Sequence, residues 1–245
     1  MDTMILCLFG RAGCECLNYL LLNNYFSYKE IIIFTHIKNN ETLLNFINSL
    51  NIIYYTTSIN NCEDIIKNKK GILLSIHYRN IIKENIINCF EGIKINLHPS
   101  LLPYYKGCFS SVWAIINNEK ETGITYHILT PGVDEGNILI QEKIKIEEND
   151  TAFSLFHKLI TLGINKLPKL FELIRLNYEG EKQNCIGSYY KREIPYNGII
   201  DNNWTLKQKE LFVRAMYYPP YPGAILIKNE SKIIINSILE LHNNL

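Results

Sequence analysis

Two polar residues at the end of an apolar stretch are placed to do chemistry together. Asn96 and His98 follow the short apolar segment 92–95 and precede a loop, residues 99–107, that contains two prolines and a glycine. Residues i and i+2 of a strand point to the same side, so this amide and this imidazole would face one spot. In open α/β sheets, ligands bind outside the carboxyl ends of the strands. The pair predicts a polar site at a sheet edge, although Asn-x-His alone is more typical of a capped strand end.

A carboxylate follows in the second half of the same region. Segments 122–129 and 138–141 have strand patterns on either side of a loop bounded by glycine and proline, and Asp134 lies in that loop. We expect this aspartate to reach His98, where its opposite charge would raise the histidine pKa and a hydrogen bond would fix the ring. Asn96, His98 and Asp134 are therefore the candidate catalytic residues.

These residues also carry a family resemblance. With the sequence His-Pro-Ser-Leu-Leu-Pro that begins at His98 and the Asp-x-Gly motif of Asp134, they resemble the 10-formyltetrahydrofolate-dependent formyltransferases. The resemblance extends from Asn96 to Gln141, with residue types in the order and spacing of the family. That family includes glycinamide ribonucleotide, methionyl-tRNA and sugar N-formyltransferases. It implies transfer of a formyl group from 10-formyltetrahydrofolate, as co-substrate, to an amine.

These side chains can supply the hydrogen-bond donors and the proton carrier that formyl transfer needs. The tetrahedral oxyanion needs hydrogen-bond donors, and the Asn96 amide is one. The attacking amine must lose a proton and the folate nitrogen must gain one, and His98 can accept or donate it. No metal is needed, and no His, Cys, Asp or Glu grouping has metal-ligand spacing. His127, inside a strand pattern, is interpreted as more often structural than functional.

The resemblance also implies a folate site beside the catalytic residues. Segment 71–78 has the pattern of a strand with a polar end, and in the family such a strand end offers backbone groups to the pterin ring. The alternative is that the last two of its side chains only cover the sheet edge. The candidate folate-binding residues are Ile76, His77, Tyr78, Gly132 and Val133.

Composition limits the classes of function. The 245 residues carry a net charge of +1, so no broad basic field would hold RNA or DNA. The apolar N-terminal run 4–9 is too short for a signal peptide or a membrane span and lacks a basic flank. The seven cysteines are odd in number and lie mostly in apolar runs, which favours reduced thiols and a cytoplasmic protein.

Strand and helix patterns alternate along most of the chain. Apolar runs near 4–9, 31–35, 52–55, 71–78 and 92–95 are separated by helical patterns, which predicts a doubly wound, mostly parallel α/β sheet. The Gly-x-x-Gly sequence that begins at Gly10 favours a plain strand-to-helix turn over a nucleotide-phosphate loop. We predict a catalytic formyltransferase domain at 1–178 and a small C-terminal α+β domain, with a helix and a β-hairpin, at 179–245.

The C-terminal part of the chain favours one branch of this family. Val213-Arg214-Ala215 and the segment 219–224 resemble the end of sugar-nucleotide N-formyltransferases. The tRNA-formylating members carry a longer RNA-binding domain, and the glycinamide ribonucleotide enzymes usually stop earlier. The resemblance implies a nucleotide-linked amino sugar as acceptor, first of all dTDP-4-amino-4,6-dideoxyglucose for surface polysaccharide or O-antigen. Methionyl-tRNA, glycinamide ribonucleotide and a non-catalytic folate- or nucleotide-binding role are the alternatives.

Aromatic and basic residues outside the catalytic segment are candidates for holding the nucleotide. An aromatic face can stack on a base, and lysine or arginine can pair with a diphosphate. The competing interpretation is that the tyrosines form the core of the small domain, and that Lys106 positions its loop. The terminal strand pair is a possible homodimer edge. The candidate substrate-binding residues are Lys106, Tyr189, Lys191, Arg192, Trp204 and Tyr221.

Overall fold

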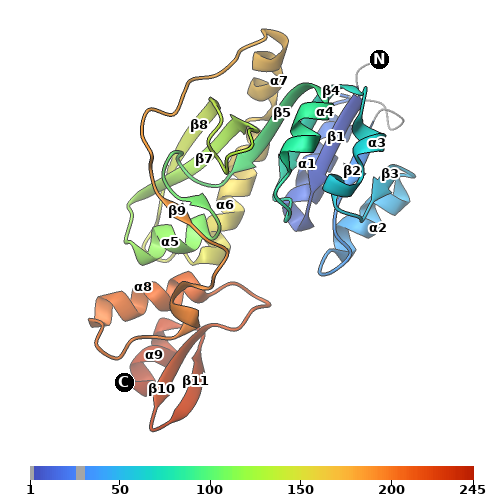
Figure 1. Cartoon of the computed structure of the whole chain (residues 1–245). Helices are drawn as coiled ribbons and strands as arrows, with labels where there is room; N and C mark the ends of the chain where they lie inside the picture. Colours follow the sequence, from blue (N-terminus) through green and yellow to red (C-terminus); the bar gives the residue numbers. More distant parts are fainter. Residues whose placement is uncertain (1–2, 26–30) are drawn as a thin grey trace. The chain divides into compact units, whose positions relative to one another are not determined.

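A seven-stranded sheet is the central element of the computed structural model, which describes residues 3–25 and 31–245 (Figure 1). Its strand order is β3-β2-β1-β4-β5-β7-β8. The first five of these strands pair in parallel, and β7 runs antiparallel to β5. The predicted mostly parallel α/β sheet is thus confirmed. The strands are β1 (Thr3–Leu8), β2 (Ile31–Phe34), β3 (Ile53–Tyr55), β4 (Lys70–Ile76), β5 (Glu91–His98), β7 (Glu121–Ile128) and β8 (Ile138–Lys145).

Continuous burial explains why the inner strands are uniformly apolar. Residues 4–8 of β1 and all four residues of β2 are buried, as expected for parallel strands covered on both faces. The strand β5 extends three residues beyond its predicted apolar segment, so Asn96 and His98 belong to its carboxyl end.

Helices connect the strands. Between α6 and α7, Pro168 stands in the first turn of the second helix, where proline is tolerated. At the start of α6, Thr151 and Ser154 exchange backbone-to-side-chain hydrogen bonds, which satisfy amides of the first helical turn. The α-helices are α1 (Gly10–Leu22), α2 (Glu41–Ser49), α3 (Glu63–Ile66), α4 (Glu84–Cys89), α5 (Ser110–Ile116), α6 (Ala152–Asn165), α7 (Leu167–Arg175), α8 (Leu206–Met216) and α9 (Ile238–Asn244), with 3-10 turns η2 (Ile59–Asn61) and η3 (Pro195–Gly198).

Two small sheets accompany the large one. The strands β10 (Ala224–Lys228) and β11 (Ser231–Ile235) form the predicted antiparallel hairpin. Asn229 and Glu230 both have positive φ angles, the conformation that two-residue hairpin loops require. The second sheet pairs β6 (Lys106–Gly107) in parallel with β9 (Tyr189–Tyr190).

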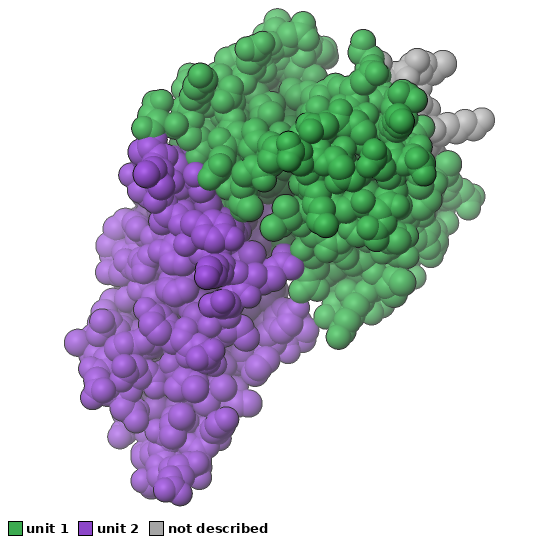
Figure 2. All heavy atoms as spheres, viewed as in Figure 1, with its two compact units in different colours: residues 1–98, 125–141, 161–184 green, residues 99–124, 142–160, 185–245 purple. Residues whose placement is uncertain are grey.

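The chain divides into two compact units, drawn in different colours in Figure 2. Unit 1 comprises residues 1–98, 125–141 and 161–184, and unit 2 comprises residues 99–124, 142–160 and 185–245. Contacts alone do not define folding domains, so the predicted boundary near residue 178 stays a prediction. A C-terminal core supports it, because seven buried residues after residue 179 pack into one cluster: Ile200, Phe212, Val213, Ala224, Leu226, Ile235 and Leu241.

Within the part of the chain that the structure describes, no helix is long and apolar enough to cross a membrane.

Candidate active site

Strand pairing places the candidate catalytic residues at one edge of the sheet in unit 1. The antiparallel register of β5 with β7 sets Asn96 opposite His127 and His98 opposite Thr125. Asn96 and His98 are two residues apart and therefore share a face of the sheet. His98 is almost fully buried, at 4% exposure.

Asp134 stands between two histidines. Its Oδ2 lies 3.4 Å from Nδ1 of His98, and its Oδ1 lies 3.3 Å from Nε2 of His127. The aspartate has a positive φ of 55°, a conformation that Asp tolerates better than most residues. The contact expected between Asp134 and His98 is therefore present. Because Nδ1 of His98 faces the carboxylate, Nε2 is the ring nitrogen that can face a substrate.

His127 is the residue that sequence reasoning undervalued. Its Nε2 lies 3.2 Å from Nδ2 of Asn96, and its Nδ1 lies 2.9 Å from the carbonyl oxygen of Ile128. The side chain is 1% exposed. It links Asn96 to Asp134 and so belongs to the same cluster. The sequence signal was its position two residues after Thr125, but only the register with β5 reveals the contact.

Gln183 holds the loop that carries Asp134. Its Nε2 donates to the carbonyl oxygens of Asp134 at 2.8 Å and of Gly136 at 2.9 Å. Gly136 has no room for a side chain, because a Cβ there would overlap the carbonyl of Ile128. Gln183 follows the predicted domain boundary at residue 178, and its polar, glycine-marked surroundings give no sign of a structural role.

The candidate folate residues also lie in unit 1. Ile76 ends β4 in register with Leu97 of β5, and His77 follows with a positive φ of 59°. The hydroxyl of Tyr78 accepts a hydrogen bond from the Ile59 amide at 3.1 Å, and burial raises its pKa. The remaining candidates, Gly132 and Val133, share the loop of Asp134. Their role toward folate stays a prediction.

The candidate nucleotide residues lie in unit 2 and differ in exposure. Tyr189 and Tyr221 are more than half exposed, and Lys191 and Arg192 are exposed as well. Lys106, in contrast, is 7% exposed and lies in β6. The register of β6 with β9 sets Lys106 beside Tyr189, and the role of these side chains toward the nucleotide stays a prediction.

Aromatic side chains of unit 2 pack against one another, and one of the candidates, Trp204, is among them. Tyr190 stacks between Tyr105, 5.6 Å away, and Trp113, 4.5 Å away. Trp204, another candidate, packs edge-on against Tyr196 at 4.9 Å and Phe212 at 5.1 Å. Its contacts favour the interpretation that this ring belongs to the small core.

With this geometry in view, the comparisons with known proteins decide the family. A family model described as formyl transferase matches residues 61–170. The GDP-perosamine N-formyltransferase of Brucella melitensis is 37% identical over 221 residues, which cover 88% of this chain and 85% of the relative. The chain belongs to the formyl transferase family, in its sugar N-formyltransferase branch.

Solved structures agree with this family. An N-formyltransferase from Helicobacter canadensis, solved with folinic acid and dTDP-3-aminofucose, has a TM-score of 0.80 and 30% identity, covering 95% of this chain and 86% of its own. A sugar 3N-formyl transferase, WlaRD, solved in the presence of dTDP and 5-N-formyl-THF, also has a TM-score of 0.80, with 29% identity over 95% of this chain and 85% of its own.

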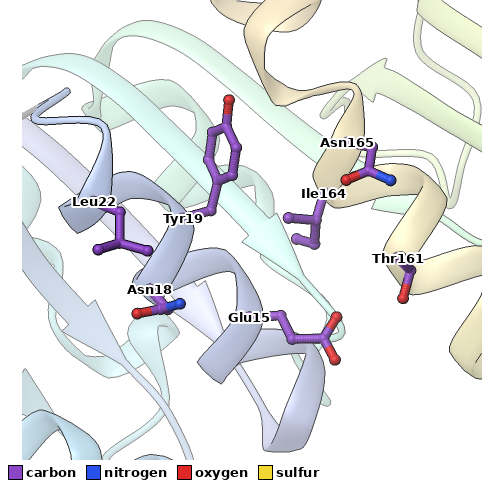
Figure 3. A pocket seen from close by; sticks show the side chains of 7 residues that line it. All are labelled: Glu15, Asn18, Tyr19, Leu22, Thr161, Ile164 and Asn165. Carbon is purple, nitrogen blue, oxygen red and sulfur yellow. The ribbon is translucent and has the colours of Figure 1, made fainter.

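This formyltransferase also has a surface hollow away from the candidate catalytic residues. Figure 3 shows its lining side chains, which come from α1 and α6 in unit 1. None of them is a candidate of the sequence analysis, and the pair Glu15 and Arg11 is an ordinary surface ion pair. The hollow is lined by Glu15, Asn18, Tyr19, Leu22, Thr161, Ile164 and Asn165.

The cysteines of this formyltransferase are all free thiols in the described structure. Burial strongly raises the pKa of Cys7 and Cys16, which keeps these thiols protonated. Among the described residues, no group of three or more His, Cys, Asp or Glu side chains is arranged to hold a metal ion.

Proposed function

We propose that this enzyme transfers the formyl group of 10-formyltetrahydrofolate to the amine of a nucleotide-linked amino sugar. The observation that carries the proposal is the cluster of Asn96, His98 and Asp134, in which the carboxylate lies 3.4 Å from the imidazole. The cluster supplies an amide donor, a proton carrier and an orienting carboxylate at one sheet edge.

In the proposed reaction, the amine nitrogen attacks the formyl carbon and forms a new carbon–nitrogen bond. The Asn96 amide stabilises the oxyanion of the tetrahedral intermediate. Nε2 of His98 accepts the proton that the amine loses and returns a proton to N10 of the folate as the old carbon–nitrogen bond breaks. Asp134 holds Nδ1 of His98 and thereby keeps Nε2 directed toward the substrates.

His127 has a positioning role in this mechanism. Its Nε2 lies within 3.3 Å of the second carboxylate oxygen of Asp134 and 3.2 Å from the Asn96 amide nitrogen. It therefore fixes two of the three catalytic side chains relative to each other. Gln183, which donates to two carbonyl oxygens of the Asp134 loop, holds the backbone that carries this carboxylate.

The folate is proposed to lie against the strand end 76–78 and the loop residues Gly132 and Val133. The register of β4 with β5 supports this position, because Ile76 faces Leu97, one residue before His98. Neighbouring strands are about 4.8 Å apart, which brings backbone groups of this strand end within reach of a ligand at His98. Gly132 and Val133 belong to the same loop as Asp134.

The first proposed acceptor is dTDP-4-amino-4,6-dideoxyglucose, made for surface polysaccharide or O-antigen, in a cytoplasmic enzyme whose terminal strand pair is the proposed homodimer edge. The two relatives that were solved with dTDP or a dTDP-sugar support the thymidine nucleotide. A second candidate is GDP-perosamine, because the relative at 37% identity carries that name. Both acceptors use the same catalytic chemistry.

A panel of acceptors tests this proposal. The enzyme is incubated with 10-formyltetrahydrofolate and, separately, dTDP- and GDP-linked amino sugars, glycinamide ribonucleotide and methionyl-tRNA. Mass spectrometry then detects a gain of one formyl group. Formylation of a nucleotide sugar alone supports the proposal. Formylation of methionyl-tRNA or glycinamide ribonucleotide would replace the acceptor, and folate binding without any formylation would favour a non-catalytic binding protein.

A further inference from the structure

A second cluster of side chains lies at the carboxyl edge of the sheet in unit 1, and apart from His77 the proposed function gives its residues no role. Phe9 follows β1, His36 lies shortly after β2, and His77 and Arg79 follow β4. The cluster is built from one cation, two imidazoles and one aromatic ring. Its composition differs from that of a simple apolar sheet edge.

The guanidinium of Arg79 is held in place by its neighbours. Its Cζ lies 4.7 Å from the centroid of the Phe9 ring, within the range of a cation–π interaction. The rings of His36 and His77 meet Phe9 edge-on at 5.6 and 5.7 Å. The backbone amide of Arg79 donates to Nε2 of His36 at 3.3 Å. The arginine is therefore ordered by a ring and a backbone contact.

The charge of Arg79 is not matched by a carboxylate. Throughout residues 3–25 and 31–245, no Asp or Glu forms an ion pair with it, whereas the nearby Arg11 pairs with Glu15 at 2.6 Å. The side chain of Arg79 is only partly buried, so its guanidinium is accessible to a ligand. A planar cation that is ordered but unmatched is suited to a phosphate group, which it binds with two parallel hydrogen bonds.

Strand register gives the distance from this cluster to the catalytic histidine. Leu8 pairs with Ile76, and Ile76 pairs with Leu97. Phe9, His77 and His98 therefore stand one residue beyond the same level on three adjacent strands. With strands about 4.8 Å apart, the cluster begins about 5 to 10 Å from His98. A diphosphate on the anomeric carbon is separated from an amine on the far side of a hexose by a distance of this order.

We propose that Arg79, ordered by Phe9 and His36, binds the diphosphate of the nucleotide sugar. The inference rests on the proposed function and deepens it, because it names the residue that positions the acceptor. The inference also transfers the principal diphosphate contact from the predicted pair Lys191 and Arg192 to the sheet edge.

Binding of the nucleotide portion alone tests the proposal without turnover. The variants are Arg79→Met, which keeps cover over the Phe9 ring but removes the charge, and Arg79→Lys, which keeps the charge but loses the planar fork. Arg175→Met, an exposed arginine in the last turn of α7, is the matched control. Affinities of dTDP, GDP, thymidine, guanosine and inorganic pyrophosphate are measured by calorimetry, and Michaelis constants by initial rates.

We expect Arg79→Met to weaken the preferred nucleoside diphosphate by on the order of 10- to 100-fold, the range for a charged hydrogen bond. The nucleoside should bind as it does to the wild type, and the Michaelis constant for the folate should change by less than about twofold, since neither involves this contact. Arg79→Lys should lie between the two proteins. Arg175→Met should match the wild type in every measurement.

Four results would overturn the inference. Equal losses of affinity for the nucleoside and the nucleoside diphosphate would mean that Arg79 only covers Phe9. A lower melting temperature of Arg79→Met with unchanged affinities would mean the same. A rise in the folate constant without a change for dTDP or GDP would assign the arginine to the glutamyl carboxylates of the folate. No binding of any nucleoside diphosphate or pyrophosphate to the wild type would also exclude the subsite.

Diphosphate binding that depends on Arg79, without formylation of any nucleotide sugar, would contradict the proposed function but not the diphosphate subsite.

Discussion

Among single residues, Asp134 has the most demanding position, because each of its carboxylate oxygens faces a different imidazole. Oδ2 lies 3.4 Å from His98, and Oδ1 lies 3.3 Å from His127. The contact with His98 was predictable, since both residues occur in recognisable motifs. The contact with His127 was not, because it depends on which residue of β7 stands opposite Asn96, and local sequence does not encode that register.

The catalytic assignment predicts large and non-additive losses. His98→Ala, Asn96→Ala and Asp134→Ala should each lower kcat by on the order of 100- to 1,000-fold while folate binding remains nearly unchanged, because the three groups act on the transition state. The double variant His98→Ala/Asp134→Ala should lose little more than His98→Ala. Steady-state kinetics measure this. If His98→Ala kept more than about a tenth of the wild-type kcat, the histidine would not have this role.

The positioning role of His127 predicts an intermediate loss. His127→Ala should lower kcat by on the order of 100-fold through misplacement of Asn96 and Asp134, with a small change in either Michaelis constant. His242→Ala is the control, since His242 is exposed and its imidazole pairs with Glu210 at 2.9 Å. Wild-type kcat in the purified, folded His127→Ala protein would show that the contact is structural.

Among the elements, the loop of Asp134 shows how a residue far along the chain maintains the site. Gln183 lies five residues after the expected domain boundary at residue 178, yet its amide donates to two carbonyl oxygens of that loop. Gln183→Glu should be more harmful than Gln183→Leu, because a carboxylate would face two carbonyl oxygens and repel them, whereas leucine only removes the bonds. The free energy of unfolding and kcat are measured for both variants. The reverse order, or wild-type values for Gln183→Glu, would mean that these hydrogen bonds do not hold the loop.

A second element, the start of α6, predicts a pH dependence of stability. Asp150 is 2% exposed, and its carboxylate contacts Lys158 at 2.7 Å, the Ser154 hydroxyl at 2.8 Å and the Glu147 amide at 2.9 Å. Burial alone raises the pKa of Asp150. Lys158 and these hydrogen bonds together lower it by more than burial raises it, so the pKa is below its ordinary value. A lowered pKa in the folded state stabilises the protein above the ordinary aspartate value of about 3.9, and this contribution is lost as the pH falls through the folded value.

Asp150→Asn should therefore be less stable than the wild type near neutral pH, and the difference should shrink in acid. Chemical denaturation at about pH 7 and at steps down to about pH 3 measures the free energy of unfolding of both proteins across the ordinary aspartate value. Asp201→Asn, at an exposed aspartate in the same unit, should show no comparable pH-dependent difference. A difference that stays constant, or grows toward acid, would contradict the assigned direction of the shift.

At the scale of the whole molecule, local patterns predicted the class of fold but not its assembly. Continuous apolar runs identified β1, β2 and β4, because strands buried on both faces cannot alternate in polarity. The reversal of β7 and the pairing of β6 with β9 depend on contacts between distant segments. The stacking of Tyr190 on Trp113 also joins distant segments, so local sequence does not reveal it. The helix α9 is too short to leave a clear periodic pattern.

The charge of the whole chain predicts weak RNA binding. The 25 lysines and arginines are balanced by 24 aspartates and glutamates, which leaves a net charge of only +1, so the affinity for tRNA should be low and its dependence on salt shallow. Binding of initiator tRNA is measured by fluorescence anisotropy at several salt concentrations. Tight binding with a steep salt slope would favour methionyl-tRNA as the acceptor.

The most direct test of the account is formyl transfer by the wild type and by His98→Ala under identical conditions. Each protein is incubated with 10-formyltetrahydrofolate and either dTDP-4-amino-4,6-dideoxyglucose or GDP-perosamine, and the product is followed by mass spectrometry. The account predicts that the wild type adds one formyl group to a nucleotide sugar and that His98→Ala forms this product at least about 100-fold more slowly. No formylated sugar with the wild type, or equal rates for the two proteins, would contradict it.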